Sequence, residues 1–293
     1  MTATDQLIAR AEALLARLEM LLPPPPPARD EDAVAWRWRK RRDQGWLAPI
    51  RRLTDIRLTD LQHIEEPRAE LERNTRQFLA GFPANNALLW GPRGTGKSSL
   101  VKALLNAYSP QGLRLVEVER QDLVDLPEIV DTIAERPGRF IVFCDDLSFD
   151  EHDQTYRELK TVLDGSVLST PDNILIYATS NRRHLVPERL RDNLDARHDE
   201  NGEIHQSEAV EEKISLSERF GLWLSFHQFN QTRYLDIAAH WLRHFGVAAA
   251  HTAETRHAAL QWALLHGSRS GRAAQQFARD WAGRVALEDH AND

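Results

Sequence analysis

A glycine-rich loop between an apolar run and a helical pattern constrains this chain more than any other feature. The apolar run is Ala87–Trp90, the loop is Gly91-Pro92-Arg93-Gly94-Thr95-Gly96-Lys97-Ser98, and a helical pattern continues to Leu105. A buried strand that runs into a glycine turn and then opens a helix is the context of a phosphate-binding loop. The glycines let several backbone N–H groups face one point beside the positive end of the helix dipole. The pattern therefore predicts a polyphosphate site rather than an ordinary Gly-rich turn.

Two side chains at the end of the loop have expected roles in binding phosphate. Lys97 should reach the β- and γ-phosphate oxygens, and the Ser98 hydroxyl should take one position on a magnesium ion. The expected nucleotide-binding residues are those of the loop and the residue after it: Gly91, Pro92, Arg93, Gly94, Thr95, Gly96, Lys97, Ser98 and Ser99.

Composition limits the class of protein. The chain has 293 residues, enough for about two domains, and a formal net charge of −7, which argues against a generally polyanion-binding surface. The single cysteine, Cys144, lies in an apolar run, so we expect it to be a buried residue in a reducing compartment, and a cysteine-based zinc site is excluded. No apolar stretch approaches the ~20 residues that cross a bilayer, and the N-terminal residues do not show a basic region followed by an apolar core and a cleavage site. We expect a cytoplasmic protein without membrane contact.

The order of patterns along the chain predicts the fold class. Residues 1–30 comprise a predicted helix with an apolar seam, followed by a polyproline linker. Apolar strands alternate with helices in residues 31–229, and the strands are expected at 87–90, 113–118, 140–144, 174–178 and 222–226. Such alternation predicts an α/β domain whose parallel sheet is sandwiched by helices. Residues 230–293 show only helical periodicity and should form a small C-terminal all-α lid domain.

The segment from Trp36 to Trp46 interleaves tryptophan with arginine and lysine. Such a pattern can stack on bases and neutralise phosphates. It fits better a set of tryptophans that pack on the domain while the arginines face water, because the chain is acidic overall.

Carboxylates and an amide follow two of the expected strands. The strand at 140–144 ends in Asp145 and Asp146, at the sheet edge where open α/β folds bind ligands. Asp145 should hold the magnesium mostly through water, and Asp146 is the candidate for orienting the attacking water and accepting its proton. Asn181, after the strand at 174–178, either hydrogen-bonds that water or a γ-phosphate oxygen or is simply a turn former.

Three arginines near the end of the chain are further candidates. Arg219, just before the last strand, either reaches the γ-phosphate of a neighbouring subunit or forms a surface ion pair. Arg272, near the start of the last helix, can reach the nucleotide from the helical domain, and Arg269 is the competing choice.

Taken together, these motifs resemble those of the AAA+ ATPases. Residues 91–98 look like Walker A, residues 140–146 like Walker B and Asn181 like sensor 1, while Arg219 looks like the arginine finger and Arg272 like sensor 2. More closely, four segments are similar to a bacterial ATP-binding family catalogued only as a domain of unknown function: Gly81–Asn86, Cys144–Phe149, Ala178–His184 and Ser215–Trp223. The second Walker B acid is Asp146 instead of glutamate, so its role as base is less secure than the role of Asp145 on magnesium.

The resemblance implies a P-loop NTPase that binds and hydrolyses Mg-ATP. The expected catalytic residues are Lys97, Asp146, Asn181 and Arg219, and the expected metal ligands are Ser98 and Asp145. A homo-oligomer through the ATP site and an unidentified protein client are the implied partners. The alternatives are an ATP-gated binding module that hydrolyses slowly and a DNA-associated ATPase similar to helicase loaders, for which the nucleic-acid evidence is the weak signal of the Trp36–Trp46 segment.

Overall fold

The structure is a computed structural model that describes residues 32–41, 44–148, 154–164, 171–181 and 219–292, together with Arg10 and two short paired strands, β7 (Arg197–His198) and β8 (Ile204–His205). Contacts divide the chain into a unit of residues 1–32 and a unit of residues 33–293. Apart from Arg10, the predicted N-terminal helix and the polyproline linker lie outside the described residues. The following description concerns the second unit.

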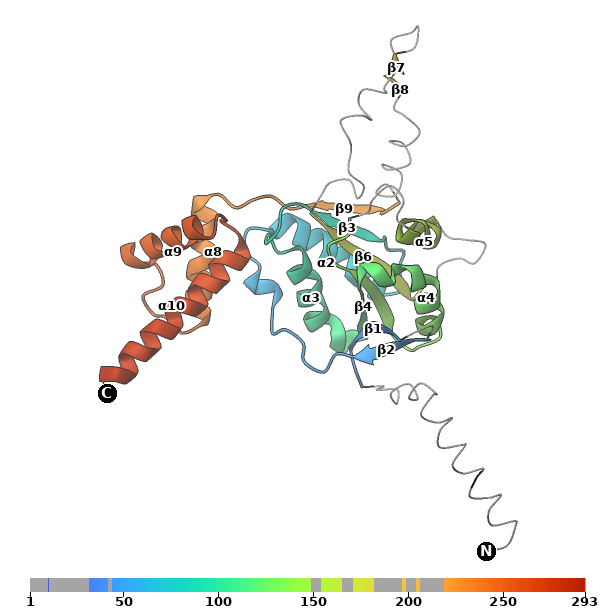
Figure 1. The fold of residues 1–293 in the computed structure, drawn as a ribbon, viewed down its shortest axis with the longest axis horizontal. Coiled ribbons are helices and arrows are strands. Elements are labelled where there is room, and N and C mark those ends of the chain that lie inside the picture. Colours follow the sequence, from blue (N-terminus) through green and yellow to red (C-terminus); the bar gives the residue numbers. More distant parts are fainter. Residues whose placement is uncertain are drawn as a thin grey trace, which may run out of the picture. The chain divides into compact units, whose positions relative to one another are not determined.

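The five strands that the sequence predicts lie parallel and next to one another in the sheet (Figure 1). They are β4 (Leu113–Val118), β5 (Arg139–Cys144), β6 (Ile174–Ser180), β3 (Ala87–Trp90) and β9 (Leu222–Ser225). The complete order is β2-β1-β4-β5-β6-β3-β9. Because β6 pairs with both β3 and β5, the ends of these three strands carry the phosphate loop, the paired aspartates and Asn181 to one edge of the sheet.

A hairpin that the sequence analysis did not predict extends the sheet beyond β4. It consists of β1 (Ala35–Arg41), parallel to β4, and β2 (Gln44–Pro49), antiparallel to β1. Trp36 and Trp38 are buried in the core. The basic residues do not simply face water, because they form ion pairs with acids beyond the hairpin: Arg37 with Glu117, Arg39 with Glu119 and Lys40 with Asp125. The Trp36–Trp46 segment is therefore a packed edge of the sheet, and its pattern no longer favours nucleic acid.

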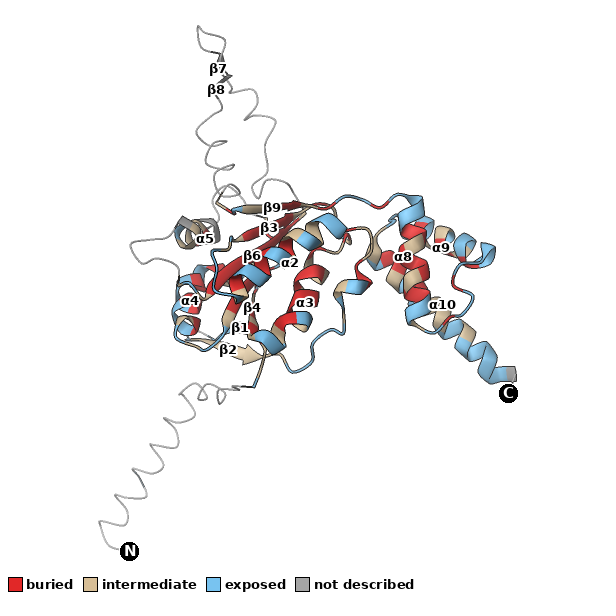
Figure 2. Cartoon of the chain, turned by 180° about the vertical axis from the view of Figure 1, so that it is seen from behind, coloured by how far each residue is buried: buried red, intermediate tan, exposed pale blue. Residues whose placement is uncertain are grey.

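Helices cover both faces of the sheet. On one face lie α2 (Glu65–Leu79) and α3 (Lys97–Tyr108), which share a core with Leu89, Phe143 and Tyr177. On the other face lie α4 (Leu126–Ala134) and α5 (Gln154–Asp164), packed with Val142 and Ile176. Short 3-10 turns, η1 (Leu58–Asp60), η2 (Ser109–Gln111) and η3 (Arg120–Asp125), join these elements. Figure 2 shows the strands buried throughout this centre. Alternating side chains of each strand thus serve two separate cores, which is why the strands read as continuous apolar runs.

Cys144 ends β5 in the second core. It is fully buried, and burial raises the pKa of its thiol to about 12. The expectation of a small buried residue is confirmed.

The last part of the chain is entirely helical. It comprises α8 (Gln231–His244), α9 (Ala253–Leu265) and α10 (Gly271–Asn292), and the side chains of Asn230 and Thr252 accept hydrogen bonds at the starts of the first two. These C-terminal helices pack around Tyr234, Trp241 and Phe277. The architecture is an α/β sheet sandwiched by helices and followed by an all-helical region, as predicted. The domain boundary at residues 229 and 230 stays a prediction. In the described part of the chain, no helix is long and apolar enough to cross a membrane.

Candidate functional site

The phosphate loop links β3 to α3 through three glycines with positive φ. These angles are +140° at Gly91, +75° at Gly94 and +101° at Gly96, a region that L-residues with a Cβ rarely adopt. At Gly91 a side chain is also excluded by space, because a Cβ would lie 2.1 Å from the Phe226 carbonyl oxygen. The three glycines of the loop are therefore required by its backbone.

Lys97 begins α3 and folds back over the loop. Its Nζ donates to the Gly91 carbonyl at 2.6 Å and to the Pro92 carbonyl at 2.8 Å, and lies 3.3 Å from Asn181 Oδ1. The pKa of Lys97 is lowered to about 8, mainly by burial; Asp145 and Asp146 act in the opposite direction, whereas the charges of Arg93 and Arg272 add to the lowering. A buried ammonium held by backbone carbonyls favours an added negative group nearby.

The next side chain, Ser98, meets the end of β5. Its Oγ donates to Asp145 Oδ1 at 2.6 Å, and Thr179 Oγ1 donates to the same oxygen at 2.6 Å. Hydroxyl and carboxylate oxygens are ligands that Mg²⁺ accepts, together with water and phosphate. The structure thus brings together the two predicted metal ligands, and adds Thr179 as a residue that orients one of them.

Asp146 is held in an unusual conformation. Its φ is +55°, and its backbone N–H donates to Thr179 Oγ1 at 2.9 Å. The Asn181 side-chain amide donates to Asp146 Oδ1, and Arg93 lies 3.3 Å from Asp146 Oδ2. Both carboxylate oxygens of the candidate base therefore have partners, and Asn181 is more than a turn former because it bridges Asp146 and Lys97.

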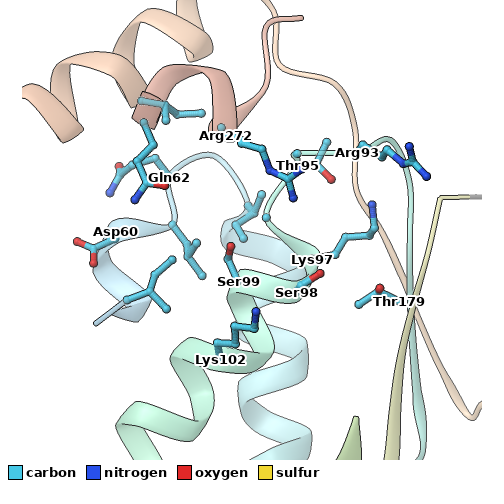
Figure 3. Close-up of a pocket in the computed structure, with 18 of the residues that line it drawn as sticks. Asp60, Gln62, Arg93, Thr95, Lys97, Ser98, Ser99, Lys102, Thr179 and Arg272 are labelled. Atoms are coloured by element: carbon cyan, nitrogen blue, oxygen red, sulfur yellow. The ribbon is translucent and has the colours of Figure 1, made fainter. Parts of the chain in front are cut away.

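These residues line a cavity of about 390 Å³ (Figure 3). Residues 93–99, Asp145, Asp146, Thr179 and Asn181 form one end of it, whereas Gly91 and Pro92 are not among its lining residues. The other end is lined by residues before α2 and residues of α8: Ile56, Asp60, Leu61, Gln62, Ile64, Ile237 and Trp241. A polar, cationic end beside a largely apolar end is suited to a nucleotide, whose polyphosphate is charged and whose base is flat and weakly polar. The volume lies within the usual range of small-molecule sites, roughly 300–1,000 Å³.

The C-terminal helices contact the phosphate loop directly. The backbone N–H of Gly271 donates to the Gly94 carbonyl at 2.8 Å. Arg272 then lines the nucleotide-sized cavity, and Figure 3 shows it beside Thr95. Arg269 instead lines a second cavity of about 570 Å³, which shares Arg93, Thr95 and Phe229 with the first. Of the two candidates, Arg272 is the one whose position fits the nucleotide cavity.

Arg219 lies at the other end of the sheet from the phosphate loop. Ser225, the last residue of β9, pairs with Trp90 beside the loop, whereas Arg219 precedes the first residue of β9, Leu222. At ~3.3 Å per residue, the first and last residues of β9 alone are about 10 Å apart. Arg219 is not among the described residues that line the nucleotide-sized cavity. It does not belong to the site of its own chain.

The sequence analysis missed the apolar end of the cavity. Segment 56–64 and two positions of α8, Ile237 and Trp241, carry no motif, and only the fold brings them opposite the loop. Thr179 had a signal, since it stands two residues before Asn181 in a segment already singled out.

A family model described as "Protein of unknown function (DUF815)" matches residues 31–285. No curated protein matches the sequence.

Solved structures resemble the chain only distantly. A RuvB mutant of Thermotoga maritima is 14% identical with a TM-score of 0.44, over 76% of this chain and 64% of that one. The ORC1 protein of Aeropyrum pernix in complex with DNA is 16% identical with a TM-score of 0.49, over 77% and 61%. The replication initiator DnaA bound to AMPPCP and single-stranded DNA is 18% identical with a TM-score of 0.47, over 73% and 60%. The chain thus spans less than two thirds of the length of each of these proteins.

Proposed function

We propose that this chain, which belongs to the family described as "Protein of unknown function (DUF815)", is an ATPase that binds Mg-ATP in the cavity of about 390 Å³. It hydrolyses ATP to ADP and phosphate at a site completed by Arg219 of a second copy, and the reaction drives conformational change or remodelling of a protein client. The observation that supports this most is the meeting of Lys97, Ser98, Asp145, Asp146 and Asn181 at one end of that cavity.

Each of these side chains has a role that follows from its position. Lys97 holds the β- and γ-phosphates, because its ammonium is buried beneath the loop and aimed at carbonyls that phosphate oxygens can replace as partners. Ser98 and Asp145 hold Mg²⁺, the ion whose charge offsets that of the phosphates. Arg272 adds a positive charge from the C-terminal helices.

Asp146 is the proposed base for the attacking water. To accept a proton it has to exchange at least one of its present partners, Asn181 or Arg93, for that water. Asn181 can then orient the water while it keeps its contact with Lys97. The short Asp side chain needs this help, since it reaches one methylene less far than glutamate.

Arg219 is proposed to act in a second copy of the chain because of where it stands. It comes three residues before the first residue of β9, at the opposite end of the sheet from the phosphate loop of its own chain. An arginine so placed can present its fixed fork of donors to the γ-phosphate of a neighbour, where such a residue contributes on the order of 10³ or more in rate.

Mixing two inactive variants tests this shared site. Lys97→Ala should lose nucleotide binding, and Arg219→Ala should lose turnover while it still binds Mg-ATP; Asp146→Asn should also bind without turnover. An equimolar mixture of Lys97→Ala and Arg219→Ala chains should regain measurable turnover, because an intact loop then meets an intact Arg219. Turnover of the Arg219→Ala chain equal to that of the wild type would rule out the shared site, and Arg233→Ala, an exposed arginine of α8, serves as the control.

A slowly hydrolysing, ATP-gated binding module is the second candidate. The observation that favours it is the arrangement of Asp146, which has a φ of +55°. Both of its carboxylate oxygens already have partners, so neither is available to accept a proton from water. Turnover slower than the release of a captured partner would support this candidate. Capturing proteins from cell extract on the Asp146→Asn chain loaded with ATP would identify the client in either case.

A further inference from the structure

Two histidine–aspartate pairs connect the segment before α2 with α8. His63 Nε2 lies 3.2 Å from Asp236 Oδ2, and His240 Nε2 lies 3.2 Å from Asp60 Oδ1. The pairs are reciprocal, because each side contributes one histidine and one aspartate. Asp236 and His240 are four residues apart and so lie on one face of α8.

The pairs flank the apolar end of the nucleotide cavity. Leu61 and Gln62 stand between Asp60 and His63 and line the cavity from one side. Ile237 and Trp241 each directly follow a paired residue on α8 and line it from the other side. The two pairs therefore fix the distance between the cavity wall formed by Leu61 and Gln62 and the wall formed by α8.

The same segment also touches the phosphate loop. A Cβ at Gly96 would lie 3.5 Å from Ile64 Cδ1 and 4.0 Å from Leu61 Cδ2, so these side chains rest against the end of the loop. Segment 60–64 thus lies between the loop and α8, in contact with both.

Segment 60–64 contains a non-glycine residue at positive φ and a buried carboxylate. His63 has a φ of +62°, and its backbone N–H donates to Glu65 Oε1 at 2.9 Å. Asp60 is 7% exposed, and its second oxygen accepts from the Arg57 backbone N–H at 2.9 Å. A non-glycine residue at positive φ and a buried carboxylate persist where surrounding contacts determine them, and such features gather at functional sites.

We propose that the pairs His63–Asp236 and Asp60–His240 form a clasp that positions both walls of the nucleoside end of the cavity and thereby sets the affinity for the nucleotide. His63, Asp236 and His240 are positioning residues, since they act through Leu61, Gln62, Ile237 and Trp241, whereas Asp60 also lines the cavity itself. The effect on affinity rests on the proposed function, whereas the effect of the clasp on α8 does not.

Exchanging the partners of the more exposed pair, His63 and Asp236, tests the clasp. Aspartate is among the residues that tolerate positive φ, so His63→Asp adds little backbone strain, and Asp236→His restores a pair of the same total length. Each single variant should raise the Kd for Mg-ADP, measured by calorimetry, about five- to tenfold. The double variant should return to within about twofold of the wild type.

The matched control exchanges a pair outside the cavity. Arg39 and Glu119 lie 3.5 Å apart on the β1 side of the sheet, so Arg39→Glu combined with Glu119→Arg should leave the Kd unchanged. His240→Gln changes the other pair. It should weaken binding of Mg-ADP, because it replaces the histidine that contacts the buried Asp60 carboxylate.

Hydrogen exchange in the nucleotide-free protein gives a readout that does not need binding. Amides of α8 should exchange faster in both single variants and at the wild-type rate in the double variant. Single variants with wild-type affinity, or a double variant as weak as the singles, would overturn the effect on affinity. Unchanged α8 exchange in the singles would overturn the clasp itself. If the wild type binds no Mg-ADP, the proposed function fails, while the exchange measurement still decides whether the clasp exists.

Discussion

Ser98 Oγ donates a hydrogen bond of 2.6 Å to Asp145 Oδ1, and this bond joins the first turn of α3 to the end of β5. Thr179 of β6 donates to the same oxygen. Three elements that are distant in sequence therefore meet at one atom, with the hydroxyl and the carboxylate that a magnesium ion would take as ligands already side by side.

Ser98→Ala should raise the Mg²⁺ concentration needed for tight ATP binding by about tenfold, because the ion loses its hydroxyl ligand while Lys97 still holds the phosphates. Calorimetric titration of ATP at several Mg²⁺ concentrations measures this. Ser98→Thr, which retains the hydroxyl, is the control. A Mg²⁺ requirement of Ser98→Ala equal to that of the wild type would exclude Ser98 as a ligand.

Nucleotide affinity should fall as the pH rises above about 8. Lys97 has a pKa of about 8 in the free protein, and bound phosphates favour its charged form, so the pKa is higher in the complex. Binding then takes up a proton in the range between these two values, and the affinity falls by up to about tenfold per pH unit there.

Calorimetry with Mg-ADP at pH 7, 8 and 9, in buffers of different ionisation enthalpy, measures both the affinity and the proton uptake. Lys97→Met has no ammonium to titrate, so its weak binding should show no such slope. Equal wild-type affinity at pH 7 and pH 9 would contradict the assignment of Lys97.

Gly94→Ala should destabilise the protein more than Gly246→Ala does. Both glycines have positive φ, +75° and +84°, so both substitutions carry backbone strain of about 1 kcal/mol. Only at Gly94 would the added Cβ collide, 2.6 Å from Ser270 Cβ, whereas nothing lies within 4 Å of a Cβ at Gly246. The collision should also break the bond from Gly271 to Gly94, for a total loss of about 2 kcal/mol or more. Urea unfolding compares the two variants, and equal losses would show that this contact adds nothing to stability.

Trp38→Ala should cost about 3–5 kcal/mol of unfolding free energy, because the side chain is 1% exposed and its indole donates to the buried carboxylate of Asp125 at 3.1 Å. Trp46, on the half-buried edge strand β2, should cost clearly less when replaced by Ala. Urea unfolding with both variants measures the difference. A Trp38→Ala protein as stable as the wild type would contradict the placement of the hairpin in the core.

Patterns confined to short stretches of the chain determined much of this protein. The glycines at 91, 94 and 96 reflect backbone angles that the loop needs, and the apolar runs at 87–90 and 140–144 reflect strands that are covered on both faces. The hairpin at 35–49 was recognisable in principle, since its tryptophans and basic residues alternate with the period of a strand. The sequence pattern correctly predicts that the tryptophans pack on the domain, but it places the arginines in water, because the acids that pair with Arg37 and Arg39 lie about 80 positions further on.

Only the tertiary structure decided which distant residues complete the site. The apolar end of the cavity joins segment 56–64 to α8, and the choice between Arg269 and Arg272 depends on which way the start of α10 meets the phosphate loop. The same holds for the pairs His63–Asp236 and Asp60–His240. These contacts depend on how helices pack across the sheet edge, and no spacing within one segment encodes that packing. The phosphate loop could thus be predicted from the sequence alone. The apolar end of the cavity and the clasp beside it depend on the tertiary fold.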